Sequence, residues 1–478
     1  MLTKLFSQLN DNQIISKLNK ILTSKWMILV ITFLTLLSNA FGLELLVLWT
    51  FTFIVVITCL FADDLLSLLT ISCCGYFTFS RSNNPLSLEQ TSIFLNPNTM
   101  IHMYAIAAVV IIVAGSRLVF DIILKKKEGA YQGKHLPKLT LGFIVLGIVY
   151  ILGGLFSEHF GYRTSLFGLF QIVTLGFSYF YFYYTVDFKK VEKDYFGWLF
   201  LSIGILLSFE TIVMLHEADF FTTTGIFTRD KIFTGWGINN NVSAMLVMMI
   251  PIPVYFALER KNTVVYLFLA NIIYIATILT QSRNGIVFGA FMLFVSLTYL
   301  FIKQNTAGRI KTILFEVTFI LLLTLYCIID IEHIQRLFSS IIAAGLNDSG
   351  RFDIYKIGFN QFLELPIFGR GFYASGLYQW GVNSETNFLP PRYHNTIIQL
   401  LASCGAVGLI GYLFHRVQTL KIFLKKLNNE RFFIGASVVG LLITSILDCH
   451  FFNMGPGFIY GALLLLAEID YIKTQGLE

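Results

Sequence analysis

The feature that most constrains this chain is its series of apolar runs, most of them long enough to cross a lipid bilayer. These runs are about 17–25 residues long, apart from two short ones at 26–40 and 65–79, and they alternate with polar turns, a pattern typical of transmembrane helices. Only 13% of the residues are charged, against about 25% in soluble domains. We therefore predict an all-α polytopic membrane protein.

The chain is predicted to form one membrane domain over residues 1–478, with about 14 spans and both termini inside. The predicted spans lie near residues 26–40, 43–62, 65–79, 99–124, 139–156, 166–186, 195–216, 242–258, 263–281, 285–302, 312–330, 395–414, 432–449 and 454–470. Lys and Arg mark cytoplasmic loops, as in the basic stretch 125–138, which places the protein in the cytoplasmic membrane as a multi-pass protein. The net charge of +6 is low for a nucleic-acid binder, and the cysteines lie in or beside apolar runs without metal-ligand spacing, so we predict no nucleic-acid partner and no metal.

One long polar loop, residues 331–394, interrupts the apolar pattern and is predicted to be extracytoplasmic. Asp348 or Ser349 is placed to cap an amphipathic helix that begins near Arg351 and ends before Pro366. Aromatic residues recur along it at spacings of three and four: Phe352, Tyr355, Phe359 and Phe362. An anion beside Arg351 would meet both the guanidinium and the N–H groups of the first turn. The alternative is that Arg351 pairs with Asp353 or with a lipid phosphate.

Further candidates for substrate binding follow in the same loop. Gly369 and Gly371 flank Arg370 in a turn that would let backbone approach a ligand, and Arg370 is either a phosphate contact or a solvated side chain. Tyr373 and Trp380 could stack on sugar rings, although aromatic residues also form belts at membrane interfaces.

His394 and Asn395 stand where the polar loop becomes an apolar helix. A neutral imidazole there can accept a proton from a sugar hydroxyl, whereas an isolated interfacial histidine would have no such role. Gly405, Gly408 and Gly411 follow on one predicted helix face and would permit close helix packing.

Arg283 lies in Gln-Ser-Arg-Asn-Gly (281–285), between two apolar runs with almost no room for a loop. An arginine at this depth is costly unless it is paired or faces a wet cavity. Arg283 either binds a diphosphate, because a planar guanidinium can bond to two phosphate oxygens, or closes the turn while its side chain reaches to the membrane surface.

Other polar residues inside or beside the spans could line a cavity or pair with arginines: Glu210, His216, Asp448 and His450. Glu217 and Asp219 are a weaker candidate pair for a divalent metal, against a solvated helix end.

The motifs together resemble the O-antigen ligase and O-antigen polymerase superfamily over about residues 230–415. The order is Ser-Arg near a tight turn, Gly-Arg opening a helix, Pro-x-x-Gly-x-Gly, His-Asn and His-x10-Gly. The stretch 235–241, which includes Asn239, is similar to the asparagine-bearing segment of that family. Asn284 departs from the glycine that is common after Ser-Arg, which puts the depth of Arg283 in doubt.

The resemblance implies a glycosyltransferase that moves a glycan from undecaprenyl diphosphate to an acceptor sugar hydroxyl, without metal or other cofactor and with inversion at the anomeric carbon. It assigns the catalytic roles to His394, Arg283 and Arg351. The implied partners are the lipid-linked oligosaccharide, an acceptor glycan and the bilayer; a flippase and a chain-length regulator are further candidates.

We favour a repeat-unit polymerase of surface polysaccharide over a ligase, because the Phe-, Lys-, Asn- and Ile-rich composition hints at an AT-rich Gram-positive source without lipid A core. The alternatives are a ligase that attaches finished polysaccharide, a transporter of the lipid-linked glycan, and a metal-dependent transferase that uses Glu217 and Asp219.

Overall fold

The computed structural model describes residues 13–62, 64–79, 97–125, 136–189, 191–192, 194–217, 220, 233–234, 237–343, 350–374 and 392–475. These residues are helical apart from their connections and one short antiparallel pair, β1 (Phe233–Thr234) with β2 (Gly237–Ile238). The predicted all-α polytopic class is confirmed in this coarse form.

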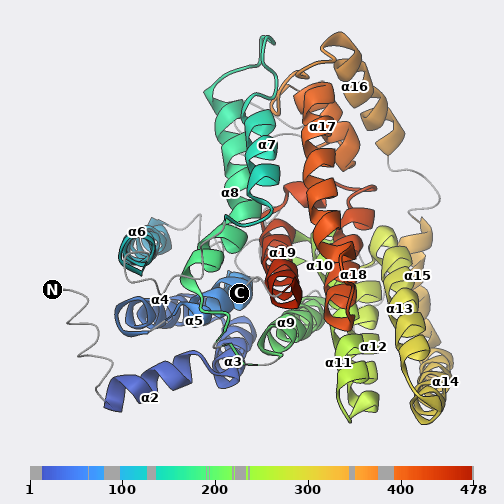
Figure 1. Cartoon of the computed structure of the whole chain (residues 1–478). Coiled ribbons are helices and arrows are strands. Elements are labelled where there is room, and N and C mark those ends of the chain that lie inside the picture. Colours follow the sequence, from blue (N-terminus) through green and yellow to red (C-terminus); the bar gives the residue numbers. More distant parts are fainter. Residues whose placement is uncertain are drawn as a thin grey trace.

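The helices form one bundle, which Figure 1 shows coloured from the amino terminus (blue) to the carboxy terminus (red). The amino-terminal helices are α2 (Gln13–Leu22), α3 (Lys25–Phe41), α4 (Glu44–Phe61), α5 (Leu66–Cys74), η1 (Gly75–Phe79), α6 (Pro97–Phe120), η2 (Asp121–Lys125), α7 (Thr140–Ile151), α8 (Tyr162–Thr185) and α9 (Tyr195–Glu217). The carboxy-terminal helices are α10 (Asn239–Met249), α11 (Pro251–Glu259), α12 (Thr263–Leu279), α13 (Arg283–Lys303), α14 (Thr306–Ile329), α15 (Ile331–Ala343), α16 (Arg351–Glu364), α17 (Thr396–Leu424), α18 (Asn429–Thr444), η5 (His450–Phe452) and α19 (Met454–Gln475).

Nine helices in the described part of the chain are long and apolar enough to cross a membrane, counting α10 and α11 as one. A tenth is possible if α2 and α3, bent by 66°, form a single span. The predicted count of about 14 is not confirmed, because several apolar runs form shorter helices. The run at 65–79, for example, divides into α5 and η1.

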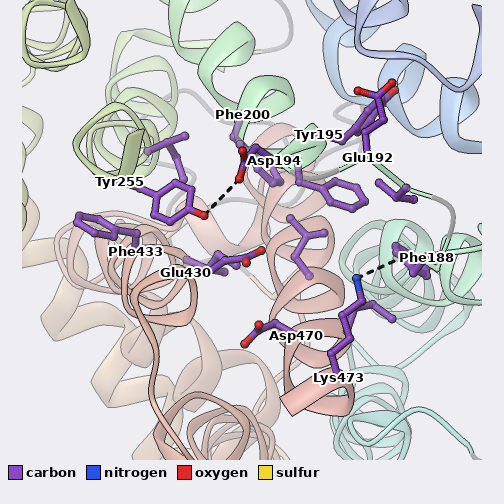
Figure 2. Close-up of a pocket in the computed structure, with 17 residues that line it drawn as sticks. Phe188, Glu192, Asp194, Tyr195, Phe200, Tyr255, Glu430, Phe433, Asp470 and Lys473 are labelled. Atoms are coloured by element: carbon purple, nitrogen blue, oxygen red, sulfur yellow. Dashed lines mark hydrogen bonds between the residues drawn. The ribbon is translucent and has the colours of Figure 1, made fainter. Parts of the chain in front are cut away.

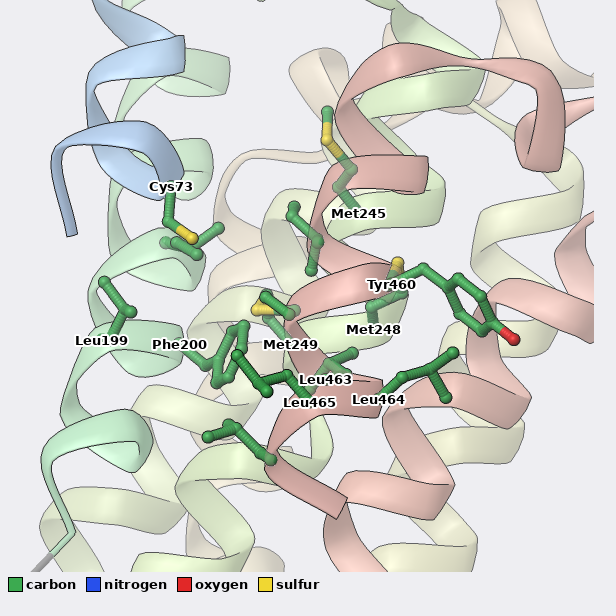
Figure 3. Packing of buried hydrophobic residues seen from close by; sticks show 14 of the residues in the cluster. Cys73, Leu199, Phe200, Met245, Met248, Met249, Tyr460, Leu463, Leu464 and Leu465 are labelled. Carbon is green, nitrogen blue, oxygen red and sulfur yellow. The ribbon is translucent and has the colours of Figure 1, made fainter. Parts of the chain in front are cut away.

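The core of the bundle lies where α9, α10 and α19 meet. Figure 3 shows methionines of α10, such as Met249, against Leu463 and its neighbours on α19, with Phe200 of α9 beside them. The α10–α11 pair is almost entirely enclosed by protein, as expected for helices that are apolar on every side. The side chains of α14, by contrast, are mostly exposed, as expected for a helix that faces lipid.

The loop predicted at 331–394 contains two helices in its described part, α15 and α16. As predicted, α16 begins at Arg351 and ends before Pro366. The predicted caps Asp348 and Ser349 lie outside the described residues. The buried face of α16 is formed by Ile354, Gly358 and Gln361, whereas the aromatic residues Phe352 and Phe359 are exposed.

A break in α17 holds the loop in place. At Gly405 the backbone is non-helical, with φ 65° and ψ −160°. The segment 366–371 satisfies the backbone groups that the break frees: the N–H of Arg370 donates to the carbonyl of Ala402 (2.8 Å), and the N–H of Ala406 donates to the carbonyl of Pro366 (2.8 Å). The end of α16 is therefore joined to the middle of α17 through backbone contacts.

Candidate active site

His394 stands at the start of α17 and bonds to an aspartate from another part of the chain. Its backbone is left-handed (φ 49°), and its Nδ1 lies 3.1 Å from Oδ1 of Asp448. The His394 side chain is 37% exposed and that of Asp448 only 7%. Asn395 accepts hydrogen bonds from the N–H groups of Ile397 and Ile398, so it is the N-cap of α17. The imidazole therefore projects from a fixed helix end.

Asp448 lies between α18 and η5, is buried, and accepts several hydrogen bonds. It accepts from the side chain of Asn240 (3.1 Å) and from the N–H of Cys449 (2.7 Å), besides His394. Burial alone would raise the pKa of Asp448. The charge that His450 can carry, the hydrogen bond and charge of His394, and the Cys449 N–H outweigh burial and hold that pKa well below its usual range. Asp448 is therefore a carboxylate at any physiological pH.

Arg351, in the first turn of α16, reaches the same aspartate. Its Nη1 donates to the carbonyl of Leu447 (2.6 Å), and its Nη2 lies 3.9 Å from Oδ2 of Asp448. The hydroxyl of Tyr355, one turn further along α16, donates to the carbonyl of His394 (3.0 Å). The structure thus brings Arg351 and His394 together at Asp448.

Arg283 occupies the first position of α13, after the N-cap Ser282. Its neighbour Asn284 donates to the carbonyl of Thr444 at the end of α18 (2.8 Å), and the N–H of Thr396 in α17 donates to the carbonyl of Ser445 (3.1 Å). The end of α13 that carries Arg283 and the start of α17 therefore adjoin the same short segment, 444–448, that leads to Asp448.

A second group of hydrogen-bonded polar side chains lies beside the contacts of Asp448. Arg392, two residues before His394, donates to Oδ1 of Asn453, and Nδ2 of Asn453 donates to Oδ1 of Asn241. Nδ1 of His450 also lies 2.9 Å from Oδ1 of Asn241. Burial lowers the pKa of His450 to about 4; Asp448 opposes this shift, and the charges of Arg392, His394 and Arg351 add to it. His450 is therefore neutral near pH 7.

The other predicted site residues have structural contacts. Asn239 donates to the carbonyl of Thr280 at 3.5 Å. Arg370 forms ion pairs with Glu158 (2.8 Å) and Glu364 (2.9 Å).

The glycines that flank Arg370 are packed against protein: a Cβ on Gly369 would be 2.6 Å from the backbone of Ser403 in α17, and one on Gly371 would be 3.3 Å from the hydroxyl of Thr164 in α8. The guanidinium of Arg163 lies over the ring of Tyr373, with its Cζ 4.9 Å from the ring centroid. Trp380 lies outside the described residues.

Residues that the sequence analysis missed are Arg392, Asn240, Asn241 and Asn453, and it gave Asp448 no specific role. Two signals were present: Arg392 stands two residues before His394, and the asparagines at 239–241 directly precede an apolar run. Neither signal identifies a partner, because the bonded residues are far apart in sequence.

A cavity of about 280 Å³ lies at the other end of the bundle, between α9, α11, α18 and α19 (Figure 2). Besides Glu430, its acidic side chains form ion pairs: Asp194 with Arg260, Asp470 with Arg431, and Glu192 with Lys25. Within the described residues, no group of three or more His, Cys, Asp or Glu side chains is arranged to hold a metal ion. Asp219 and the side chain of Glu217 lie outside that part.

Comparison with known proteins agrees with the resemblance seen in the motifs. No curated protein matches the chain. A family profile described as O-antigen ligase matches residues 232–413, a range that contains Arg283, Arg351, Arg392 and His394. Over these residues the chain is similar to the O-antigen ligase family, as the order of its motifs predicts.

Proposed function

We propose that the protein transfers a glycan from undecaprenyl diphosphate to a sugar hydroxyl, and that its main reaction is the polymerisation of repeat units for a surface polysaccharide. The match to the O-antigen ligase profile and the long apolar helices support a ligase-type or polymerase-type glycosyltransferase in a membrane. The observation that supports the reaction best is the meeting of His394 and Arg351 at the buried carboxylate of Asp448.

His394 is the proposed general base. An imidazole whose Nδ1–H donates to a carboxylate carries its free lone pair on Nε2, so the contact with Asp448 selects the basic tautomer for that nitrogen. Nε2 takes the proton of the acceptor hydroxyl while the hydroxyl oxygen attacks the anomeric carbon. The positive charge that forms on the ring is then stabilised by Asp448.

Arg351 and Arg283 are the proposed ligands of the leaving diphosphate. The bond between the anomeric carbon and the diphosphate oxygen breaks with its electrons on the oxygen, and attack from the opposite face inverts the configuration. Guanidinium groups stabilise the charge that develops on the leaving group. Arg351 is suited to this role because its contact with Asp448, at 3.9 Å, leaves its N–H groups incompletely used.

Arg370 is not assigned to the diphosphate in this proposal. Its charge is already balanced by Glu158 and Glu364, and its backbone N–H and carbonyl bond to α17 and to the hydroxyl of Ser157. We assign it a structural role that joins the end of α16 to the 157–158 turn.

The test is an assay with purified protein in lipid nanodiscs. The substrate is the lipid-linked oligosaccharide that accumulates in a strain lacking the protein, and products are read by gel and mass spectrometry. A ladder of repeats is expected from the wild type and no ladder from His394→Ala, with His102→Ala as a control far from the site. Transfer of one finished chain to a different acceptor would indicate a ligase, and glycan movement across vesicles without any new glycosidic bond would indicate a transporter.

A further inference from the structure

Arg392 has less compensation for its charge than Arg351 and Arg370, which lie at the same end of the bundle. It lies against the 448–453 segment, and its one hydrogen bond to the described residues goes to the neutral amide of Asn453. Within the part of the chain that the structure describes, no carboxylate lies within ion-pair distance of it. A guanidinium has five N–H donors, so most of the donors of Arg392 have no partner among the described residues.

Charged neighbours do not remove this imbalance. Asp448 is already bonded to His394, Asn240 and the Cys449 N–H, with Arg351 at 3.9 Å. His450 contributes no negative charge. Arg351 and Arg392 therefore place two permanent positive charges around one carboxylate. Because a buried charge without a partner is costly, such an excess is expected where a ligand supplies the missing anion.

The position of Arg392 indicates which part of the reaction it serves. Arg392 stands two residues before His394, and both side chains bond to the 448–453 segment, His394 to Asp448 and Arg392 to Asn453. The residue between them, Tyr393, is buried against Ile354 and Ala402. Arg392 therefore lies next to the base that receives the acceptor proton, whereas Arg351 and Arg283 come from other helices.

We infer that Arg392, oriented by Asn453, binds an anionic group with two oxygens, a carboxylate or a phosphate, on the acceptor glycan. This rests on the proposed function and adds a substrate class to it: an acidic acceptor sugar rather than a neutral one. The shared chemistry, two oxygens gripped by one planar guanidinium, would also fit the carrier diphosphate, so the experiment must separate the two sources.

The experiment measures the melting temperature of the purified full-length protein with three soluble probes: methyl β-D-glucuronide, neutral methyl β-D-glucoside and inorganic pyrophosphate. For the wild type we expect a rise with glucuronide and none with glucoside. Arg392→Gln should raise the half-saturating glucuronide concentration about tenfold or more, as expected for loss of a charge-assisted bidentate contact, while the response to pyrophosphate persists. Arg392→Lys should be intermediate, because it keeps the charge and loses the planar fork.

Two controls separate binding from folding. Arg260→Gln removes an arginine at the far end of the bundle and should leave every probe response unchanged. Without ligand, Arg392→Gln should melt at the wild-type temperature or above it, because it removes one of two positive charges that share the carboxylate of Asp448. A lower melting temperature with unchanged probe responses would show a merely structural residue and overturn the inference.

Loss of the pyrophosphate response alone would assign Arg392 to the carrier diphosphate and overturn the acceptor assignment. His394→Ala should lose transfer yet keep the glucuronide response. If wild-type protein forms no glycosidic bond but still responds to glucuronide through Arg392, the proposed function fails and the anion subsite stands.

Discussion

At the scale of single residues, the proposed chemistry depends on which nitrogen of His394 faces Asp448. Nδ1 is bonded to a carboxylate that is ionised throughout the physiological range, so Nε2 is the nitrogen available to accept a proton. Asp448 therefore acts through His394 and is a positioning residue in this proposal.

Asp448→Asn should lower the turnover number by about 10- to 100-fold, less than the roughly 100- to 10,000-fold that general-base catalysis contributes as a whole, because His394 is still present. The amide can accept a hydrogen bond from His394, but it cannot stabilise the imidazolium that forms during transfer. Donor binding should change much less than turnover, and rates measured against donor concentration check this. Glu158→Asn, which removes an exposed carboxylate from another ion pair, is the control. Wild-type turnover in Asp448→Asn would contradict the assignment.

His450 should make stability depend on pH. Its pKa is about 4 in the folded protein and about 6.5 in an unfolded chain, so the unfolded state binds an extra proton between these values. The free energy of unfolding should therefore be constant above about pH 7.5 and fall by up to about 3 kcal/mol as the pH drops from 6.5 to 4.

Melting curves in detergent at a series of pH values check this expectation. His450→Gln should flatten the decline relative to the wild type, whereas the exposed His102→Gln should not. Parallel curves for His450→Gln and wild type would show that His450 is not the group responsible.

At the scale of elements, the break in α17 determines where α16 lies. The carbonyls and N–H groups freed at Gly405 bond to segment 366–371, so the helix that carries Arg351 is fastened to the helix that begins beside His394. The predicted glycine face had been expected to allow close helix packing. Gly411 does contact Val149 of α7, whereas Gly405 marks a break.

Gly405→Ala should destabilise the protein by about 1–3 kcal/mol, since its backbone lies in a region that is essentially restricted to glycine. A Cβ there would also be 2.3 Å from the carbonyl oxygen of Ile367. The melting temperature and the transfer rate should both fall.

Gly115→Ala is the matched control, because no atom lies within 4 Å of its added Cβ in helix α6. It should leave the melting temperature unchanged or slightly higher, given the better helix propensity of alanine. Equal melting temperatures for the two variants would mean that the break at Gly405 is not required.

At the scale of the whole molecule, the proposed site and a set of basic turns lie at opposite ends of the bundle. His394, Arg351 and Asp448 lie at one end. The turns at the other end carry basic residues: Arg260, Lys261, Lys303, Lys425 and Lys426. Since Lys and Arg accumulate in cytoplasmic loops, this asymmetry favours an outward-facing active site.

Cysteine labelling on intact cells tests this orientation. In a Cys327→Ser background, a cysteine replacing Glu364 at the end of α16 should react with a membrane-impermeant maleimide. A cysteine replacing Lys303 at the end of α13 should react only after lysis. The reverse pattern would invert the topology and place the proposed site in the cytoplasm.

The features that could be predicted are those encoded locally. The tight turn before Arg283, the start of α16 at Arg351 and its end before Pro366 all agree with the structure, because capping, proline and apolar spacing act over a few residues. The number of spans was less accessible, because an apolar run of intermediate length can cross the membrane or form a short buried helix.

By itself, the sequence determined that this chain enters a membrane as helices and that His394, Arg351 and Arg283 stand at helix ends beside polar segments. Burial of apolar surface and local backbone preferences are enough to fix those properties. Only the tertiary structure decided that Asp448 bonds to His394, 54 residues away, and to Asn240, 208 residues away, and that Arg392 rests on Asn453. Such pairings depend on how the helices pack against one another, which no short stretch of sequence specifies.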